Sequence, residues 1–238
     1  MTTLLVDGDI VAYQAATANE HTIDWGDGLW TLHSFADEVY QYAENMITTL
    51  LSQAGCSNAL ILLTDGPVFR KDVDPEYKAN RIGKRKPVCL PQVRKMMVSN
   101  MKTMSTDGLE ADDLIGIFAT KSPKDYIVWS PDKDLRQIAG SHLIDGKVIT
   151  ITEEEGERSF WMQVLTGDTA DNYKGCIGVG PVKAEKVLDA DDGLTVWQKV
   201  VKAYEKAGQT EEDAIVTARL AHILTFKTKD TVWSPPDD

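Results

Sequence analysis

Acidic residues gather in five short groups along this 238-residue chain. Each group offers hard oxygen ligands, with no His or Cys beside it in the sequence. If the groups converge in the fold, their charges raise one another's pKa values unless cations neutralise them. Such a site prefers Mg²⁺ or Mn²⁺, and two ions about 4 Å apart suit displacement at a phosphoryl group. The groups are Asp7 with Asp9, Asp65, Glu110 with Asp112 and Asp113, Asp132 with Asp134, and Asp168 with Asp171.

Each group taken alone also has a purely structural interpretation. The acids of Glu110–Asp113 suit the start of a helix, and Asp132 can cap the helix that follows it. Asp168 and Asp171 can simply flank a turn. Both interpretations stay open for any single group, whereas the joint pattern favours a metal site.

The net charge of −12 hides one strongly basic segment. Residues 1–65 contain nine acids and neither Lys nor Arg, whereas residues 66–105 contain ten basic residues and three acids, a net of +7. A basic patch of this size can bind a polyanion even on an acidic protein. A solvated loop and helix face would give the same composition. Beside a metal site, the segment suggests a phosphodiester substrate.

Three of the acidic groups directly follow apolar runs that are typical of buried β-strands. Helical periodicity between these runs predicts an α/β fold with a mostly parallel central sheet flanked by helices. Ligands of such sheets bind beyond the carboxyl ends of the strands, so the acids should meet there. The runs are Thr2–Val6, Ala59–Leu63 and Tyr126–Trp129, and the acids that follow them are Asp7, Asp65 and Asp132.

The rest of the chain supplies further elements of the same fold. Residues 66–90 are basic, interrupted by Pro and Gly, and expected to be mostly loop. Beyond residue 151 we expect helices with one Gly-rich turn at 175–180. Apolar spacing predicts helices at 11–18, 35–51, 93–104 and 109–120, and turn residues predict a hairpin-like excursion at 19–32 and a strand pair at 142–151.

The cysteines and the N-terminus indicate the compartment. Cys56, Cys89 and Cys176 form neither a disulfide framework nor a zinc-ligand pattern, which is typical of reduced thiols in an intracellular protein. The chain begins without the basic and apolar regions of a signal peptide. No apolar run approaches the ~18 residues of a transmembrane helix. We therefore expect a cytoplasmic protein that does not contact membranes.

Four stretches carry motifs whose order along the chain is informative. Asp65–Arg81 contains Phe-Arg followed by Pro-Glu-Tyr-Lys-Ala-Asn-Arg, and Leu109–Ile115 contains Glu-Ala-Asp-Asp. Pro131–Leu135 contains Asp-Lys-Asp-Leu, and Leu165–Ala184 contains Gly-Asp-Thr-Ala-Asp-Asn and a Gly-Val-Gly turn. Over roughly residues 3–225 the sequence resembles the flap endonuclease / 5′→3′ exonuclease family, in a compact bacteriophage-type form.

The resemblance implies a PIN-like 5′-nuclease core and a ligand set for two Mg²⁺ ions, for which Mn²⁺ can substitute. Some ligands would act through a coordinated water. The first ion would be bound by Asp7, Asp65, Glu110, Asp112 and Asp113, and the second by Asp132, Asp134, Asp168 and Asp171.

The resemblance also implies catalytic and nucleic-acid-binding residues. Lys78 and Arg81 would stabilise charge on the scissile phosphate, and Asp132 is the third expected catalytic residue. Tyr77 would stack on a terminal base. The Gly-Val-Gly turn would grip duplex DNA through backbone N–H groups and can hold K⁺ in the family. The full nucleic-acid-binding set is Arg70, Tyr77, Lys78, Arg81, Lys84, Arg85, Lys86, Gly178, Gly180, Lys183 and Lys186.

The organisation implied by the resemblance has two parts. Residues 1–155 would form the nuclease core, with a basic arch at about 66–108, and residues 156–238 a helical region with a helix–three-turn–helix. The expected protein is a monomeric 5′→3′ exonuclease or 5′-flap endonuclease that hydrolyses DNA, and RNA in hybrids, by a two-metal-ion mechanism. It would act at 5′ ends, nicks and flaps, in the host cytoplasm if it comes from a phage. Two alternatives stay open: a non-catalytic module that binds nucleic-acid structure, and a PIN-type ribonuclease.

Overall fold

The computed structural model describes residues 2–236, so Met1 and the last two residues of the predicted 156–238 region lie outside it. The strands are β1 (Thr3–Asp7), β2 (His21–Gly26), β3 (Leu29–His33), β4 (Asn58–Leu62), β5 (Thr103–Met104), β6 (Tyr126–Trp129), β7 (Gly140–Ile144), β8 (Lys147–Ile151), β9 (Gly167–Asp168) and β10 (Tyr173–Lys174). The helices are α1 (Gly8–Ala18), α2 (Ala36–Ala54), α3 (Arg70–Val73), α4 (Leu90–Asn100), α5 (Ala111–Lys121), α6 (Glu153–Thr166), α7 (Pro181–Leu188), α8 (Val196–Lys206) and α9 (Glu211–Ala221), with short 3₁₀ turns η1 (Ala79–Arg81) and η2 (Lys133–Gln137).

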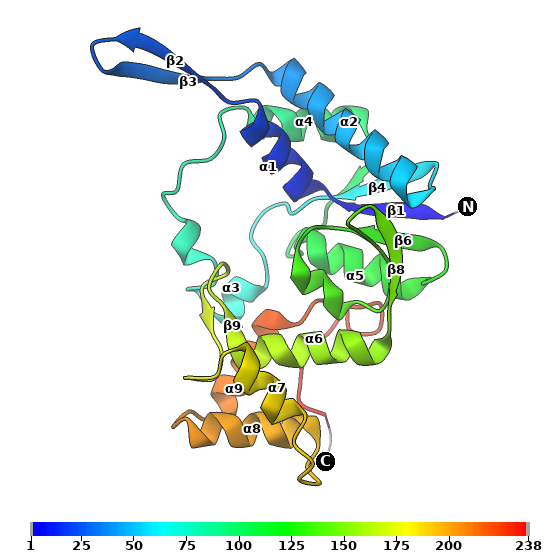
Figure 1. The fold of residues 1–238 in the computed structure, drawn as a ribbon, viewed down its shortest axis with the longest axis vertical. Helices are drawn as coiled ribbons and strands as arrows, with labels where there is room; N and C mark the ends of the chain where they lie inside the picture. The colour runs from blue at the N-terminus through cyan, green and yellow to red at the C-terminus, as the bar shows by residue number, and fades with distance from the viewer. Residues whose placement is uncertain (1, 237–238) are drawn as a thin grey trace.

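A six-stranded sheet in the order β5-β4-β1-β6-β7-β8 forms the centre of the molecule (Figure 1). Neighbouring strands are parallel except for β7 and β8. β1 lies between β4 and β6, with Asp7 opposite Leu62 and Val6 opposite Trp129. The carboxyl ends of these three strands therefore share one edge. The predicted α/β class with a mostly parallel sheet is confirmed.

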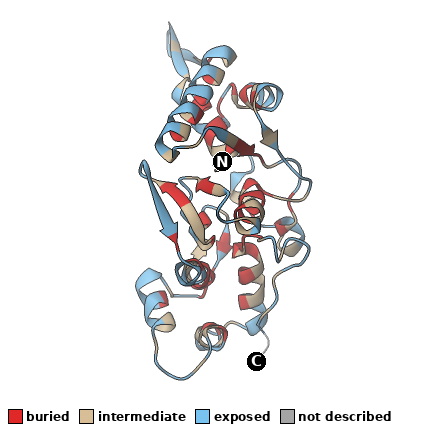
Figure 2. Ribbon diagram, turned by 90° about the vertical axis from the view of Figure 1, so that its right-hand side faces the viewer, coloured by how far each residue is buried: buried red, intermediate tan, exposed pale blue. Residues whose placement is uncertain are grey.

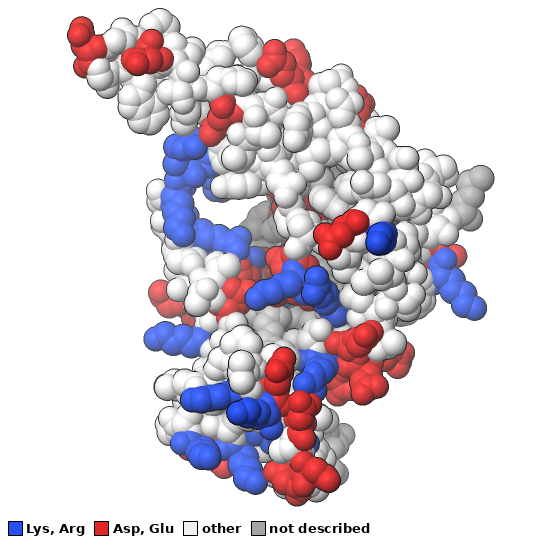
Figure 3. Space-filling model, viewed as in Figure 1, with Lys and Arg blue, Asp and Glu red and all other residues white. Residues whose placement is uncertain are grey.

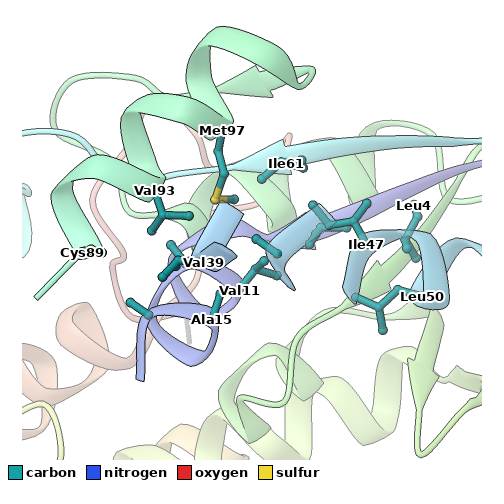
Figure 4. Packing of buried hydrophobic residues seen from close by; sticks show 14 of the residues in the cluster. Leu4, Val11, Ala15, Val39, Ile47, Leu50, Ile61, Cys89, Val93 and Met97 are labelled. Carbon is teal, nitrogen blue, oxygen red and sulfur yellow. The ribbon is translucent and has the colours of Figure 1, made fainter. Parts of the chain in front are cut away.

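Both faces of this sheet are covered, which explains why its strands are continuous apolar runs. Side chains alternate along β1. Leu4 and Val6 enter a core with α1, α2 and α4 (Figure 4). Leu5 packs on the opposite face with Leu114 and Ile115 of α5. Since both faces are filled, a ligand can approach only at the edge where the strands end.

A third core holds the C-terminal helices α6 to α9 together. Within it, Trp233 packs edge-on against Trp161 and Trp197, with ring centroids 6.0 and 5.4 Å apart. Val68 and Tyr77 of the basic segment also enter this core, so the segment joins it to the sheet. Figure 2 shows buried residues running through both parts, whereas the β2–β3 hairpin is mostly exposed.

Two elements differ from the sequence-based expectation. The helix predicted at 93–104 ends at Asn100, because Thr103 and Met104 pair with β4 as an edge strand. The region beyond residue 151, expected to be helical apart from one turn, also contains the β9–β10 pair. This pair is the element that carries Asp168 and, in its loop, Asp171. The expected 19–32 excursion is the β2–β3 hairpin.

The three cysteines are free thiols, and none lies in the site described below. Buried Cys89 and Cys176 each place Sγ 3.3 Å from a backbone carbonyl oxygen, of Ser34 and Ala203 respectively. Among residues 2–236, no helix is both long enough and apolar enough to cross a membrane.

Candidate active site

Three acids follow neighbouring strands and meet at one edge of the sheet. Asp7 ends β1 and is only 3% exposed. Its carboxylate accepts the N–H of Ile10 at 3.1 Å, which caps α1, and the hydroxyl of Ser130 at 2.9 Å. Asp65 and Asp132 follow β4 and β6 as exposed residues of the adjoining turns. The strand order therefore brings together the acids that the sequence places after separate apolar runs.

Asp112, in the first turn of α5, joins these strand-end acids. Burial, followed by the charges of Asp7, Asp132 and Glu110, raises the pKa of Asp112 well above its ordinary value. Burial also raises the pKa of Asp7 to about 6, with contributions from the charges of Asp9 and Asp132 and despite its two hydrogen bonds. These carboxylates are therefore close enough to repel one another.

Asp134 and Asp168 extend the same cluster of acids. Burial and the charges of Asp132 and Asp168 raise the pKa of Asp134 to about 7. The side-chain amide of Gln163 donates to Asp134 at 2.6 Å, which fixes the orientation of the carboxylate. Asp168 accepts the N–H of Ala170 at 2.6 Å and so holds its own loop.

A pair of glycines shapes the loop that carries Asp168 and Asp171. Gly167 has φ of 67°, a region that L residues rarely occupy. A Cβ on Gly167 would lie 2.2 Å from the backbone nitrogen of Gly175. Glycine is therefore required where the two ends of the loop cross.

We call Asp7, Asp112, Asp132, Asp134 and Asp168 the bare group. Within residues 2–236, none of the five has a Lys or Arg nitrogen within 4.0 Å. The hard oxygen donors of all five, and the raised pKa values of Asp7, Asp112 and Asp134, fit a divalent cation, which would supply the missing positive charge. Among the described residues, no three acids, His or Cys are already arranged to hold a metal ion.

Arg70 lies at the centre of a second set of acids, whose charges are neutralised by cations. Its guanidinium is buried and uses all five N–H donors. Nη1 donates to Glu110 at 2.9 Å and to Asp113 at 2.7 Å. Nη2 donates to Asp113 at 2.8 Å and the His222 carbonyl at 2.6 Å, and Nε donates to the Leu220 carbonyl at 2.9 Å. This group is enclosed and fully paired, which favours a structural role; the predicted binding of nucleic acid by Arg70 stays a prediction.

Asp113, a predicted metal ligand, belongs to the same ion pair as Arg70. Besides the fork of Arg70, it accepts the N–H groups of Leu224 and Glu110, each at 3.1 Å. Burial by itself would raise the pKa of Asp113, but the charge of Arg70 and these hydrogen bonds hold it below its ordinary value. Both carboxylate oxygens serve this enclosed ion pair, which favours a structural role for Asp113; its predicted role as a metal ligand stays a prediction.

Tyr77 is a buried linker between acids. Its ring is 2% exposed and stacks on Tyr173, with centroids 6.3 Å apart. Its hydroxyl lies 2.9 Å from Glu110 and 3.0 Å from Asp171. Burial and the charge of Glu110 raise the pKa of Tyr77 far above its usual range, so the hydroxyl stays protonated and donates. The ring therefore has little surface free for a DNA base, and the predicted base stacking by Tyr77 stays a prediction.

Lys78 and Arg81 neutralise the remaining acids from the more exposed side of the cluster. Lys78 Nζ lies 2.5 Å from Glu110 and 3.4 Å from Asp171, and Arg81 pairs with the other oxygen of Asp171. Burial would lower the pKa of Lys78, but these two carboxylates outweigh it and raise the pKa. The side chains of Lys78 and Arg81 are 21% and 53% exposed, so a bound phosphate can reach both. We call Glu110, Asp113 and Asp171 the paired group.

Residues 82–88, which we call the strap, are exposed except for buried Pro87. Lys84, Arg85 and Lys86 are exposed on it. Figure 3 shows Lys and Arg side chains along one edge of an opening between the strap and the body. The strap is the part of the predicted 66–108 arch that bridges open space in Figure 1. Binding of nucleic acid by its three cations stays a prediction.

The Gly-rich turn before α7 lies at the far end of the molecule from the hairpin (Figure 1). Gly178 has φ of 74°, and Gly180 is the N-cap of α7. Lys183 donates to the Gly178 carbonyl at 2.7 Å. Lys183 and Lys186 both line a groove between α7 and α8. The duplex-binding role of these four residues stays a prediction.

A comparison with known families decides the relationship of the chain. The family described as 5′-3′ exonuclease, N-terminal resolvase-like domain, matches residues 2–165. The chain belongs to this 5′-3′ exonuclease family. Membership confirms the predicted family, and with the sheet topology it confirms the fold class and a nuclease of the 5′→3′ type.

Two phage proteins match this exonuclease-family chain over most of its length. The exonuclease of Escherichia phage T7 is 26% identical over 94% of this chain and 88% of its own length. The exodeoxyribonuclease of Enterobacteria phage T3 is 25% identical over 98% of this chain and 92% of its own length. Because both alignments are nearly complete, the similarity includes the C-terminal helices as well as residues 2–165.

A solved structure shares the fold at low sequence identity. The bacteriophage T5 flap endonuclease, in a pseudo-enzyme–product complex with DNA and metal ions, has a TM-score of 0.69 and 15% identity. The match covers 96% of this chain and 91% of that protein. The arrangement of sheet and C-terminal helices is therefore that of a phage-type 5′-nuclease.

Several supporting residues of this family member have no motif in the sequence. Ser130 orients Asp7, and its place directly after a predicted strand was the one available signal. Gln163 comes from α6, far along the chain from the acid it contacts. Asp9 pairs with Arg94 and accepts the N–H of Thr64 at 3.0 Å, so it joins the ends of β1 and β4.

Proposed function

We propose that the chain is a divalent-metal-dependent 5′→3′ exonuclease and 5′-flap endonuclease that hydrolyses DNA phosphodiesters, and RNA in hybrids. One observation carries the proposal: a bare group of acids, repelling one another, lies beside cations. A cluster of this kind repels phosphate unless metal ions occupy it. A protein that only bound nucleic acid would have no use for it.

We assign the metal ions to the bare group together with Asp65. The T5 flap endonuclease was crystallised with metal ions, which supports divalent metal in this chain too, and the oxygen donors favour Mg²⁺, with Mn²⁺ as a substitute. Bound there, the ions would supply Lewis acidity and an activated water for phosphodiester hydrolysis. Glu110 and Asp171, which Lys78 and Arg81 already neutralise, would complete the ligand sets of the two metal ions.

The chain's own residues position the substrate. Lys78 and Arg81 are placed to hold the scissile phosphate and stabilise the charge that develops on it. They can reach it because both lie at the more exposed side of the cluster, unlike Arg70. Ser130 and Gln163 keep Asp7 and Asp134 in fixed orientations.

The proposed division of labour has two parts. Residues 1–155 would form the nuclease core, and the region from 156 would hold the duplex through the Gly178–Gly180 turn, Lys183 and Lys186. That turn is also the proposed K⁺ position, because helix-preceding loops offer backbone groups to ions and phosphates. The T5 protein's complex with DNA supports a DNA substrate for this fold.

A product ladder tests the proposal directly. Flap, nicked and blunt duplexes labelled at the 5′ end would be incubated with Mg²⁺, and with EDTA as the control. We expect cleavage at or near the 5′ junction in Mg²⁺ only, while duplex binding persists in part in EDTA. Full cleavage in EDTA, or products released only from the 3′ end, would contradict the proposal.

A further inference from the structure

Glu20 is an acid whose surroundings the nuclease chemistry does not explain. It lies one residue beyond the C-cap of α1, Asn19, and its backbone N–H donates to the Thr17 carbonyl at 3.4 Å. Its side chain is 8% exposed although its partner Arg85 is 60% exposed. One carboxylate accepts three hydrogen bonds from the strap: two from the fork of Arg85, at 2.7 and 2.8 Å, and one from the N–H of Val88 at 2.7 Å.

These bonds attach one end of the strap to the end of α1. The other end is attached to the β9–β10 loop: the N–H of Lys78 donates to the Asp171 carbonyl at 2.8 Å, and Asn80 donates to the Thr169 carbonyl at 2.9 Å. Between these two attachments, Ile82 is 76% exposed and the backbone hydrogen bonds stay within the segment. The strap therefore bridges the β9–β10 loop and the end of α1, with the opening of Figure 3 beside it.

The geometry of the Glu20 contact argues for anchoring. A bidentate carboxylate–guanidinium pair fixes direction as well as charge. The added bond from the Val88 backbone holds the chain itself, which a freely moving surface ion pair would not do. If Arg85 served only to attract phosphate, a carboxylate held against both Nη atoms would weaken that attraction.

We propose that Glu20 is a positioning residue that anchors the strap and so sets the opening through which the single-stranded 5′ end reaches the site. This inference rests on the proposed function. With the anchor in place, the strap holds its cations at a fixed position over the entry. Without it, the strap stays tied at the β9–β10 loop and, through buried Pro87 and Cys89, at the start of α4, but it loses the contacts that fix Arg85 and Val88 between these points, and a flap loses its guide.

Steady-state kinetics on two substrates test the anchor. For Glu20→Gln we expect KM for a 5′-flap substrate to rise about tenfold, the effect of roughly 1.4 kcal/mol, with kcat nearly unchanged. KM for a nicked duplex without a flap should change much less. Arg85→Lys keeps the charge but loses the fork, so it should show the same KM increase.

The matched control is Asp24→Asn, which removes one negative charge from the adjoining hairpin and leaves the strap untouched. Asp24 is exposed and bonds only to its own turn, at the N–H of Gly26. This variant should behave as wild type. A lower KM for Glu20→Gln would overturn the proposal, since it would mean that Glu20 merely masks Arg85. A wild-type KM for Arg85→Lys would overturn it equally.

Limited trypsin digestion gives a readout that does not depend on activity. The strap contains Lys84 and Arg85 as cleavage sites, so Glu20→Gln should be cut there several times faster than wild type and Asp24→Asn. Equal rates would overturn the anchor. If wild type cleaves no flap substrate at all, the proposed function fails, whereas the trypsin comparison still decides whether Glu20 holds the strap.

Discussion

The bare group and the paired group differ in what surrounds the same kind of side chain. Asp112 and Asp113 are neighbours in α5, yet they belong to different groups. The pKa of Asp112 is raised by burial and by nearby carboxylates, whereas Arg70 holds the pKa of Asp113 below its ordinary value. Asp113 contributes to holding the fold together, and Asp112 is left for a ligand. Successive helix residues point in different directions, so Asp112 meets the rest of the bare group and Asp113 meets the interior.

The largest effect should follow from breaking the paired group. Asp113→Asn leaves Arg70 buried without its main counter-charge, and removing one partner of a buried pair costs about 3–5 kcal/mol. Urea unfolding, with the midpoint and slope compared to wild type, measures the loss. Exposed Asp107, in the loop before α5, provides the control as Asp107→Asn. Wild-type stability of Asp113→Asn would show that the pair does not hold the fold.

Substitution in the bare group should have the opposite effect on stability. Asp112→Asn should lower the cleavage rate by more than about a hundredfold, since even outer residues of metal sites contribute up to that factor. In EDTA at pH 8 the same variant should be more stable than wild type, because one of several repelling charges is gone. Flap cleavage and thermal unfolding would be measured side by side. A variant with lower stability than wild type in EDTA would place Asp112 in the paired group instead.

The bare group should also change how the stability of the fold depends on pH. An acid whose pKa is raised in the folded state binds its proton more tightly there, so its contribution to stability falls as pH rises from about 4 to 7. Asp134→Asn removes this term. We expect it to be about 1–3 kcal/mol more stable than wild type at pH 8 without metal and nearly equal at pH 4.

The difference between variant and wild type is the quantity to measure for Asp134. Buried His222 has a pKa lowered to about 4 by burial, so it destabilises the folded state as pH falls, and it is present in both proteins. Urea unfolding from pH 4 to 8 in EDTA gives the difference at each pH. A difference that does not change with pH would contradict the raised pKa of Asp134.

The smallest expected effect is that of removing the Tyr77 hydroxyl, and it tests the role of Tyr77. Tyr77→Phe removes the hydroxyl between Glu110 and Asp171 and should cost about 1 kcal/mol of stability. Because the ring is buried, affinity for DNA with a 5′ end, measured in EDTA, should stay at the wild-type value. Tyr77→Leu should likewise leave that affinity unchanged after correction for the folded fraction. A selective loss of affinity in Tyr77→Leu would support the base-stacking role instead.

The acids after the strands could be predicted because strand, turn and carboxylate are adjacent in the chain. Asp7, Asp65 and Asp132 follow apolar runs, and a parallel sheet brings such ends to one edge. The partners of these acids could not be predicted in the same way. Arg70 is found in a basic stretch, where composition suggests a surface. Only the fold encloses it between α5 and the carbonyls of Leu220 and His222 at the end of α9.

The sequence by itself determined the family, the α/β class and the inventory of acids and cations, because these depend on residue type, order and periodicity. Tertiary structure alone decided which acid belongs to which group. That choice depends on long-range contacts, such as Arg70 with Asp113 and Glu20 with Arg85, between residues far apart in the chain. Burial increases the free-energy effect of each of these contacts, because a charge in the interior has no water to stabilise it and depends on its protein partners.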